Sequence, residues 1–132
     1  YMNLNLVVAE EAPAIADHEN ILLNQIENIP QHSCKSLVLQ ETLNYLTLEQ
    51  FYTILEKIRH QGVITISSPD AMAISTALCW GKINMETFSN LTSNRICQYT
   101  LLDTKSQLEQ RGYAIEIANT NEMSFYIRAR RP

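Results

Sequence analysis

The chain has 132 residues, the length of one ordinary domain, and a chain of this size buries about two thirds of the surface that it exposes when unfolded. A hydrophobic fraction of 45% and a charged fraction of 18% exclude the intrinsically disordered class. The net charge of -4 gives no general attraction for polyanions, which argues against nucleic acid as a partner. We therefore expect a single domain that spans residues 1–132.

The cysteines and the apolar runs indicate the compartment. Cys34, Cys79 and Cys97 lie far apart, without the spacing of a metal or redox pair, and no signal peptide is recognisable. No apolar run approaches the roughly 20 residues that span a bilayer. These features predict reduced thiols, a soluble cytoplasmic protein and no membrane association.

Four short apolar segments of the first half are expected to be strands, at residues 3–9, 20–26, 35–40 and 63–67. The runs "SLVLQ" and "GVITIS" lack a clean polar alternation, which is typical of parallel strands covered on both faces. Between them, Thr47 and Gln50 form a capping box, and the helix that they begin is predicted to reach Gly62. The earlier segment "EEAPAIADHE" has room for only a turn or a very short helix.

The second half begins with helices and ends with alternating strands. A helix is predicted from Asp70 to Gly81, apolar on nearly every side and therefore substantially buried or covered by a neighbour. A short helix is predicted from Asn84. The next helix follows Thr100 and ends at Gly112. Residues 113–118 and 124–130 alternate between apolar and polar side chains around a polar turn, which predicts an antiparallel hairpin.

This order of elements predicts one fold class. Strands alternate with helices through short loops, so we expect an α/β, reduced Rossmann-like architecture. Its sheet is expected to be mostly parallel, with about six strands and a C-terminal antiparallel hairpin.

Two long stretches of the sequence resemble the class I SAM-dependent methyltransferases, particularly their compact type 11 members. The stretch "SLVLQETLNYLTLEQFYTILEKIRHQGVITISSPD" is similar to the family's strand, helix and following strand that ends in Pro-Asp. The stretches "YTLLDTKSQLEQRGYAIEIA" and "SFYIRARRP" resemble its last helix and last two strands, and "MNLNL" resembles its first strand. The resemblance covers nearly the whole chain and implies the methyltransferase fold.

The departures from this family fall where it binds SAM. The family's first strand leads into a glycine-rich turn, because a residue without Cβ lets the backbone approach the cofactor. All three glycines of this chain, Gly62, Gly81 and Gly112, lie later, and the family's acidic residue at the end of the second strand has no clear counterpart. Leu43, Asn44 and Tyr45 stand where many members have Leu-Glu-His.

Polar residues that follow the predicted strands form the candidate pocket, since open parallel sheets bind ligands beyond the carboxyl ends of their strands. In this pocket Glu41 or Asp70 could serve as a base. The simpler alternative, which we favour, is that Asp70 caps a helix, the serines satisfy strand ends and the glutamates face solvent. The complete set is Glu10, Glu11, Gln25, Gln40, Glu41, Ser67, Ser68 and Asp70.

Other chemistry finds less support in the sequence. His18, His32 and His60 lack partners at metal-binding spacing, so we expect no metal, and no nucleophile motif is present. The cluster of Trp80 with Met72, Met85, Phe88 and Leu91 is expected to be core, with a lid or an oligomer surface as the alternative.

The leading functional hypothesis is a methyltransferase-like domain that binds no cofactor and acts as a structural or protein-interacting module. A shortened first half would leave one sheet face under-covered, which a second copy or a protein partner could cover. The alternative is an active SAM-dependent methyltransferase with an atypical cofactor site, so whether the chain is an enzyme stays open.

Overall fold

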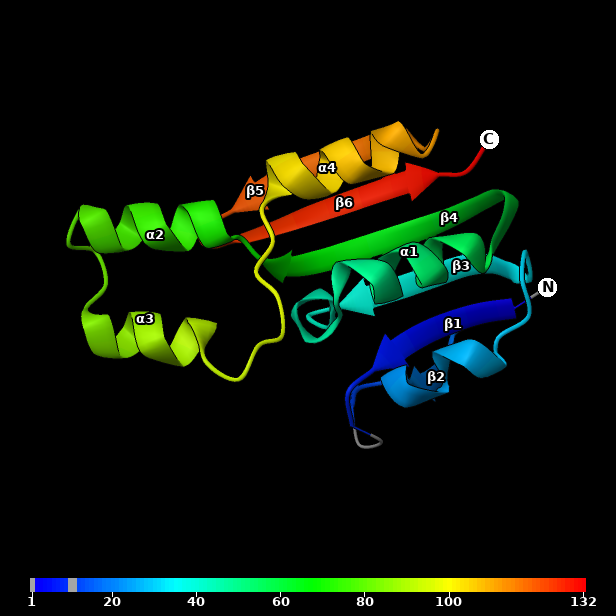
Figure 1. Cartoon of the computed structure of the whole chain (residues 1–132), viewed down its shortest axis with the longest axis horizontal. Coiled ribbons are helices and arrows are strands. Elements are labelled where there is room, and N and C mark those ends of the chain that lie inside the picture. The colour runs from blue at the N-terminus through cyan, green and yellow to red at the C-terminus, as the bar shows by residue number, and fades with distance from the viewer. Residues whose placement is uncertain (1, 10–11) are drawn as a thin grey trace.

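One mixed sheet organises the molecule, in a computed structural model that describes residues 2–9 and 12–132 (Figure 1). Its strand order is β2-β1-β3-β4-β6-β5. Neighbours from β2 to β4 pair in parallel, whereas β6 is antiparallel to both β4 and β5. The strands are β1 (Met2–Val7), β2 (Glu19–Leu22), β3 (Cys34–Gln40), β4 (Ile58–Pro69), β5 (Ala114–Asn121) and β6 (Ser124–Arg130). The predicted fold class is therefore confirmed.

The helices begin at the predicted capping residues. Gln50 N donates to Thr47 Oγ1 over 3.2 Å, and Thr47 N donates to Gln50 Oε1 over 2.9 Å, which completes the predicted capping box. The side chains of Asp70, Asn84 and Thr100 accept backbone N–H groups at the starts of the next three helices. The helices are α1 (Leu48–Glu56), α2 (Ala71–Cys79), α3 (Met85–Thr92) and α4 (Leu101–Gln110), with 3-10 turns η1 (Leu23–Asn28) and η2 (Leu43–Tyr45).

The core lies between the sheet and the helices that cover one of its faces. Leu39 pairs with Ile66, and Ile66 with Ile127, and all three side chains are fully buried. From the helix layer, Phe51 and Ile54 of α1 pack into the same cluster. Side chains two apart on a strand share a face, so this row defines the covered face.

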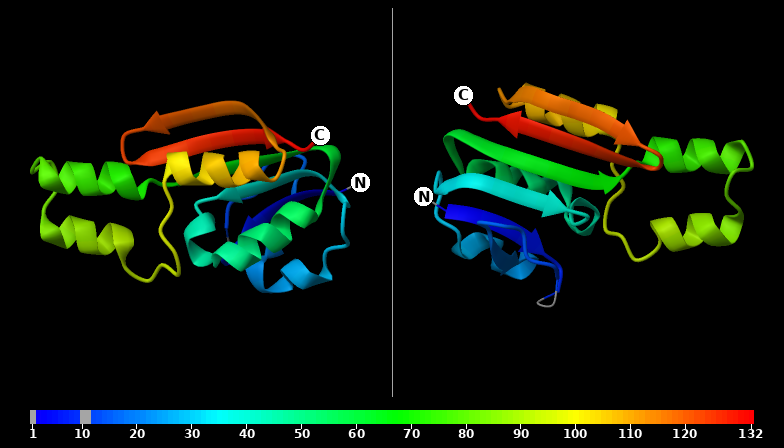
Figure 2. Two further views of the ribbon diagram at one scale, coloured as in Figure 1. Left: turned by 45° about the horizontal axis from the view of Figure 1, so that its top comes forward. Right: turned by 180° about the vertical axis from the view of Figure 1, so that it is seen from behind.

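The opposite face of the sheet carries no helix in the described part of the chain (Figure 2, right). Val38 and Thr65, which pair across β3 and β4, point to this face and are only half-buried. The expectation that the central strands are covered on both faces is therefore wrong. Apolar and polar residues alternate only weakly along β3 and β4 because the face without helices carries valine as well as threonine and serine.

The helix predicted to reach Gly62 ends at Glu56, and β4 begins at Ile58. Ile58 pairs with Cys34, and the register of the two strands shifts before Ser36 pairs with Val63. Glycine is needed at position 62 because the backbones of β3 and β4 approach closely there. A Cβ on Gly62 would lie 2.8 Å from Cys34 O. β2 also ends earlier than predicted, since residues 23–28 form η1.

Helices α2 and α3 project from one end of the sheet and lie side by side (Figures 1 and 2). Ile74 is the buried residue of α2, whereas Met72 is 66% exposed and Trp80 at the end of the helix is 76% exposed. The expectation of a core position for Trp80 is wrong. Of the two alternatives for α2, substantial burial is wrong, and α3 is the neighbour that lies beside it. An apolar sequence does not bury a helix that extends past the edge of its sheet.

Candidate functional site

A cavity of about 400 Å³ lies at the carboxyl ends of β1 and β3. This is the edge at which open α/β sheets bind their ligands. The strands supply its floor, and the segment after β1 and the turn after β3 supply its walls. The lining residues are Asn5, Val7, Val8, Ala9, Ala12, Pro13, Gln40, Glu41, Thr42 and Tyr45.

Asn5 presents an unsatisfied acceptor in this cavity. The residue is 3% exposed, and its Nδ2 donates to Asn20 Oδ1 over 3.0 Å. Asn20 Nδ2 in turn donates to the carbonyl of Ala12 over 3.1 Å, which fixes the orientation of both amides. Among the residues that the structure describes, Asn5 Oδ1 has no hydrogen-bond partner.

Thr42 brings a second unsatisfied group to the same cavity. The residue is 4% exposed, and its Oγ1 finds no hydrogen-bond partner in the described part of the chain. A buried polar group without a partner costs about 1–3 kcal/mol. A ligand that donates a hydrogen bond to Asn5 Oδ1 and shares one with Thr42 would recover part of this cost.

Glu41 places a carboxylate at the mouth of the cavity. Its backbone has a φ of 59°, in the left-handed region that residues other than glycine seldom adopt. Two contacts with Ser67 fix it: Glu41 N donates to Ser67 O over 2.7 Å, and Ser67 Oγ donates to Glu41 Oε1 over 3.4 Å. The exposed carboxylate favours a ligand that carries positive charge or hydroxyl donors.

The predicted pocket residues divide into separate groups. Gln40 and Glu41 line the cavity, and Ser67 contacts it through Glu41. Gln25 is exposed on η1, a different element. Glu10 and Glu11 lie outside the described residues.

Ser68 and Asp70 are occupied by contacts that hold the fold together. Ser68 is fully buried, and its Oγ donates to Asn44 Oδ1 over 2.8 Å. Asp70 Oδ1 accepts the backbone N–H groups of Met72 and Ala73, and its Oδ2 accepts that of Leu101 over 3.3 Å. Asp70 therefore joins the start of α2 to the start of α4.

Sequence reasoning missed Asn5, Asn20 and Thr42. The stretch "MNLNLV" holds a signal for Asn5, since an asparagine inside an apolar strand needs a polar partner when buried. Thr42 carries no such signal, because its burial depends on the turn that η2 makes after β3.

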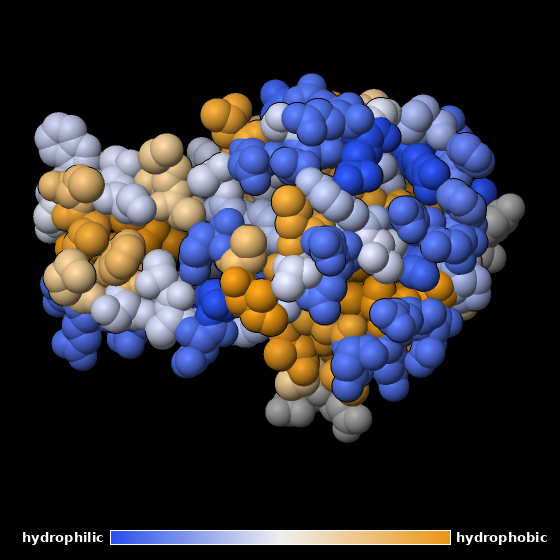
Figure 3. Space-filling view, in the orientation of Figure 1, coloured by the Kyte–Doolittle hydropathy of each residue, from blue (hydrophilic) through white to orange (hydrophobic). Residues whose placement is uncertain are grey.

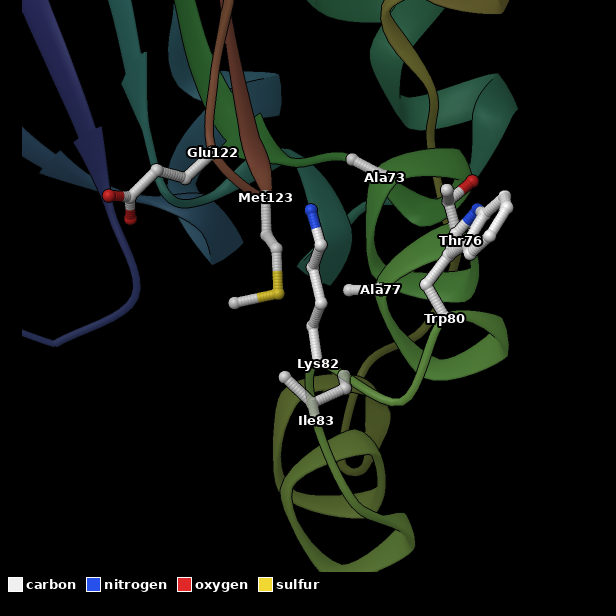
Figure 4. A pocket seen from close by; sticks show the side chains of 8 residues that line it. All are labelled: Ala73, Thr76, Ala77, Trp80, Lys82, Ile83, Glu122 and Met123. Carbon is white, nitrogen blue, oxygen red and sulfur yellow. The ribbon is translucent and has the colours of Figure 1, made fainter.

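A second hollow of about 500 Å³ lies between α2 and the turn that joins β5 to β6 (Figure 4). The side chains of Lys82 and Met123 lie alongside each other there, and Ala77 faces them from α2. The exposed apolar residues of α2 and α3 form the warm-coloured end of the molecule in Figure 3.

The strongest electrostatic effects lie away from the cavity. Burial raises the pKa of the Cys34 thiol and of the Tyr99 and Tyr113 phenols, and none of these side chains lines the cavity. In the described part of the chain, no group of three or more His, Cys, Asp or Glu side chains could hold a metal ion. Nor does any described helix combine the length and the apolar character needed to cross a membrane.

No protein-family model and no curated protein sequence matches the chain. Solved structures do match its fold. A SAM-dependent methyltransferase from Mesorhizobium loti has a TM-score of 0.64 and 18% identity, over 98% of this chain and 80% of that chain. A second one, from Archaeoglobus fulgidus, has a TM-score of 0.59 and 11% identity, over 85% and 67%. An O-methyltransferase family protein from Burkholderia thailandensis has a TM-score of 0.57 and 10% identity, over 87% and 36%.

The chain therefore has a class I methyltransferase-like fold, in a reduced, Rossmann-like form. This agrees with the resemblance noted in the sequence. The prediction that the chain takes no cofactor is contradicted, because the solved structures that share its fold include SAM-dependent methyltransferases. That prediction was drawn from the missing glycine turn, but β1 and β3 end at a cavity whose lining includes the polar residues Asn5 and Thr42.

Proposed function

We propose that the chain is a methyltransferase-like domain that binds SAM in the cavity at the carboxyl ends of β1 and β3. The observation that carries the proposal is that two residues lining this cavity each hold a buried polar atom, Asn5 Oδ1 and Thr42 Oγ1, with no partner among the described residues. The likeness to SAM-dependent methyltransferases supports SAM over other ligands with the same donors.

The chemistry of the lining fits this cofactor. SAM carries amino and hydroxyl donors, which suit Asn5 Oδ1, Thr42 Oγ1 and the Glu41 carboxylate. Its sulfonium is a cation, and the exposed Glu41 favours positive charge at the mouth. Val7, Val8 and Ala9 supply apolar walls. When bound, SAM would supply a methyl group that a nucleophilic acceptor can take from the sulfonium.

Among the candidate bases from the sequence, Glu41 is the one with access to this cavity. Asp70 accepts three backbone N–H groups, and those contacts account for its burial. We infer that Glu41 orients a donor of the ligand or accepts a proton from a methyl acceptor.

The proposal is tested by isothermal titration with SAM and with its demethylated product. We expect saturable binding of at least one of them to the wild-type chain. Thr42→Val, which removes the hydroxyl at nearly constant volume, is expected to weaken binding about fivefold through the loss of about 1 kcal/mol. A wild-type chain that gives no binding heat with either compound would overturn the proposal.

Thr104 offers a matched control for this substitution. It is fully buried, and its Oγ1 also lacks a hydrogen-bond partner, but it lies on α4 and does not line the cavity. Thr104→Val should leave binding unchanged. Equal weakening in the two variants would mean that the Thr42 hydroxyl does not contact the ligand.

A protein-binding role is the second candidate, and the sheet face without helices favours it. The two roles are compatible, because the cavity lies at the edge of the sheet and leaves the rest of that face free.

A further inference from the structure

One face of the sheet is accessible across β3, β4 and β6. We call it the open face and define it by Ser36, Val38, Val63, Thr65, Arg128 and Arg130. Cross-strand pairing sets its rows: Ser36, Val63 and Arg130 form one, and Val38, Thr65 and Arg128 form the next. None of the six side chains is fully buried. The right-hand view of Figure 2 shows this face with the helices behind it.

The open face is hollowed rather than flat. One hollow of about 490 Å³ and another of about 300 Å³ share Val38 and Thr65 in their walls. Beside the smaller hollow, Tyr126 is 38% exposed, and on the neighbouring strand Ile117 is 39% exposed. Val38, Thr65 and Tyr126 therefore give a continuous, partly apolar floor.

The larger hollow is strongly basic. Among the described residues, its lining contains His18, Lys35, Arg59, Arg128 and Arg130 and no carboxylate. At its edge, Glu116 accepts from Arg128 Nε over 3.1 Å and from Arg130 Nε over 2.9 Å, so two guanidinium groups share one carboxylate. Lys35 and the two arginines that share one carboxylate leave a local surplus of positive charge, although the chain as a whole carries a net charge of -4.

These features define what could cover the open face. Parallel strands are normally covered on both faces, and in this architecture the covering elements are helices. A second copy that presented its own open face would bring arginines against arginines, which like-charge repulsion disfavours. Nucleic acid would engage the cations but would leave the valines without an apolar partner, and the overall negative charge would oppose it.

We propose that the open face binds an acidic amphipathic helix of another protein. The apolar stripe of the helix packs on Val38, Val63 and Thr65. Carboxylates along its flank pair with Lys35 and with the guanidinium groups of Arg128 and Arg130, which have N–H donors beyond those that Glu116 accepts. This mode of recognition is a helix laid into an apolar groove, with charge complementarity setting its orientation.

The test uses the whole chain and two labelled synthetic helices of about five turns, each with leucines on one stripe. One peptide has glutamates beside the stripe, and its twin has lysines at the same positions. Fluorescence anisotropy should show saturable binding of the glutamate peptide, at least about tenfold tighter than its twin. No binding of the glutamate peptide, or equal binding of both, would overturn the proposal.

A pair of charge reversals locates the binding surface. Lys35→Glu in the basic hollow should weaken the glutamate peptide about tenfold or more. Lys105→Glu makes the same chemical change on α4, which lies on the covered side, and should leave affinity unchanged. Circular dichroism of both variants confirms that they are folded. If both charge reversals weakened peptide binding equally, the binding would depend on the net charge of the chain and not on the open face. That result would overturn the proposal.

Two further results would also overturn it. A single-stranded oligonucleotide that bound more tightly than the glutamate peptide and competed with it would assign the open face to nucleic acid. Light scattering that showed a dimer, with Lys35→Glu strengthening it, would assign the face to a second copy.

Discussion

Two buried tyrosines tie the α4–β5 half of the molecule to the segment around α1, and their burial makes stability depend on alkaline pH. Tyr113 Oη donates to Leu55 O over 2.8 Å, and Tyr99 Oη donates to Leu46 O over 3.0 Å. Burial raises the pKa of Tyr113 from its ordinary value of 10.0 to about 12. The folded chain therefore keeps a proton that the unfolded chain releases, so the free energy of unfolding falls as pH rises from 10.0 toward about 12.

Tyr113→Phe tests this linkage. At neutral pH the variant should lose about 1 kcal/mol of unfolding free energy, because a hydrogen bond disappears. Between the two pKa values the gap to wild type should shrink, since the variant has no proton to release there. Urea denaturation at neutral and alkaline pH measures both effects, with the exposed Tyr126→Phe as control. A gap that did not change with pH would contradict the prediction.

Asp70 is a second residue for which a conservative substitution can distinguish a structural role from a role as a base. In Asp70→Asn, one oxygen still caps α2, but an amide replaces the acceptor that faces Leu101 N. We expect a loss of about 1–3 kcal/mol in unfolding free energy, because a buried N–H group is left facing a donor. Thermal and urea denaturation measure it. A fully stable Asp70→Asn would mean that the carboxylate is not structural, and would restore it as a candidate base.

At the scale of elements, Gly62 fixes where β4 meets β3. A Cβ at this position would lie 2.7 Å from Ile58 Cγ2, 2.8 Å from Cys34 O and 2.9 Å from Arg59 O. Gly→Ala at an unstrained position stabilises a fold by up to about 1 kcal/mol. Gly62→Ala should instead lower the free energy of unfolding by about 1–3 kcal/mol, because backbone atoms must move. Urea denaturation gives the cost.

Gly81 is the matched control for this substitution. Its φ is 71°, but a Cβ there would meet no atom within 4 Å. Gly81→Ala adds backbone strain without a clash, so Gly62→Ala should be the more destabilising change. The reverse order would show that β3 and β4 can relax around an added methyl group.

The elements that the sequence predicted well are those whose ends depend on local chemistry. Thr47, Asp70, Asn84 and Thr100 cap helices through side-chain contacts within three residues, so their sequence positions suffice. The end of α1 was misplaced because β4 competes for Ile58 through its pairing with Cys34, a contact 24 positions away in sequence.

The candidate site was predictable only where it follows directly from a strand end. Gln40 ends β3 and Glu41 follows it directly. Both line the cavity, as expected for open sheets, which bind ligands beyond the carboxyl ends of their parallel strands. Asn5 and Thr42 became apparent only in three dimensions, because their lack of partners depends on what the segment after β1 and the turn after β3 bring close.

At the scale of the whole molecule, α2 and α3 extend beyond the sheet (Figure 1). The protein's single tryptophan, Trp80, lies at the end of α2. Trp80 is 76% exposed, and Met72 and Met85 on the same projection are 66% and 62% exposed. Because water already surrounds most of the indole, global unfolding changes its surroundings little. The far-ultraviolet circular dichroism, in contrast, reports the loss of the sheet and helices.

We therefore expect the two signals to separate during urea denaturation. The circular dichroism should show a cooperative transition, whereas the emission maximum of Trp80 should stay close to that of tryptophan in water, and iodide should quench it strongly in the native state. The measurement is repeated at rising protein concentration. A concentration-dependent shift of the emission to shorter wavelength, with protection from iodide, would show that a second copy covers the α2–α3 projection. An unchanged spectrum would leave that projection exposed in solution and confine the search for a partner to the open face of the sheet.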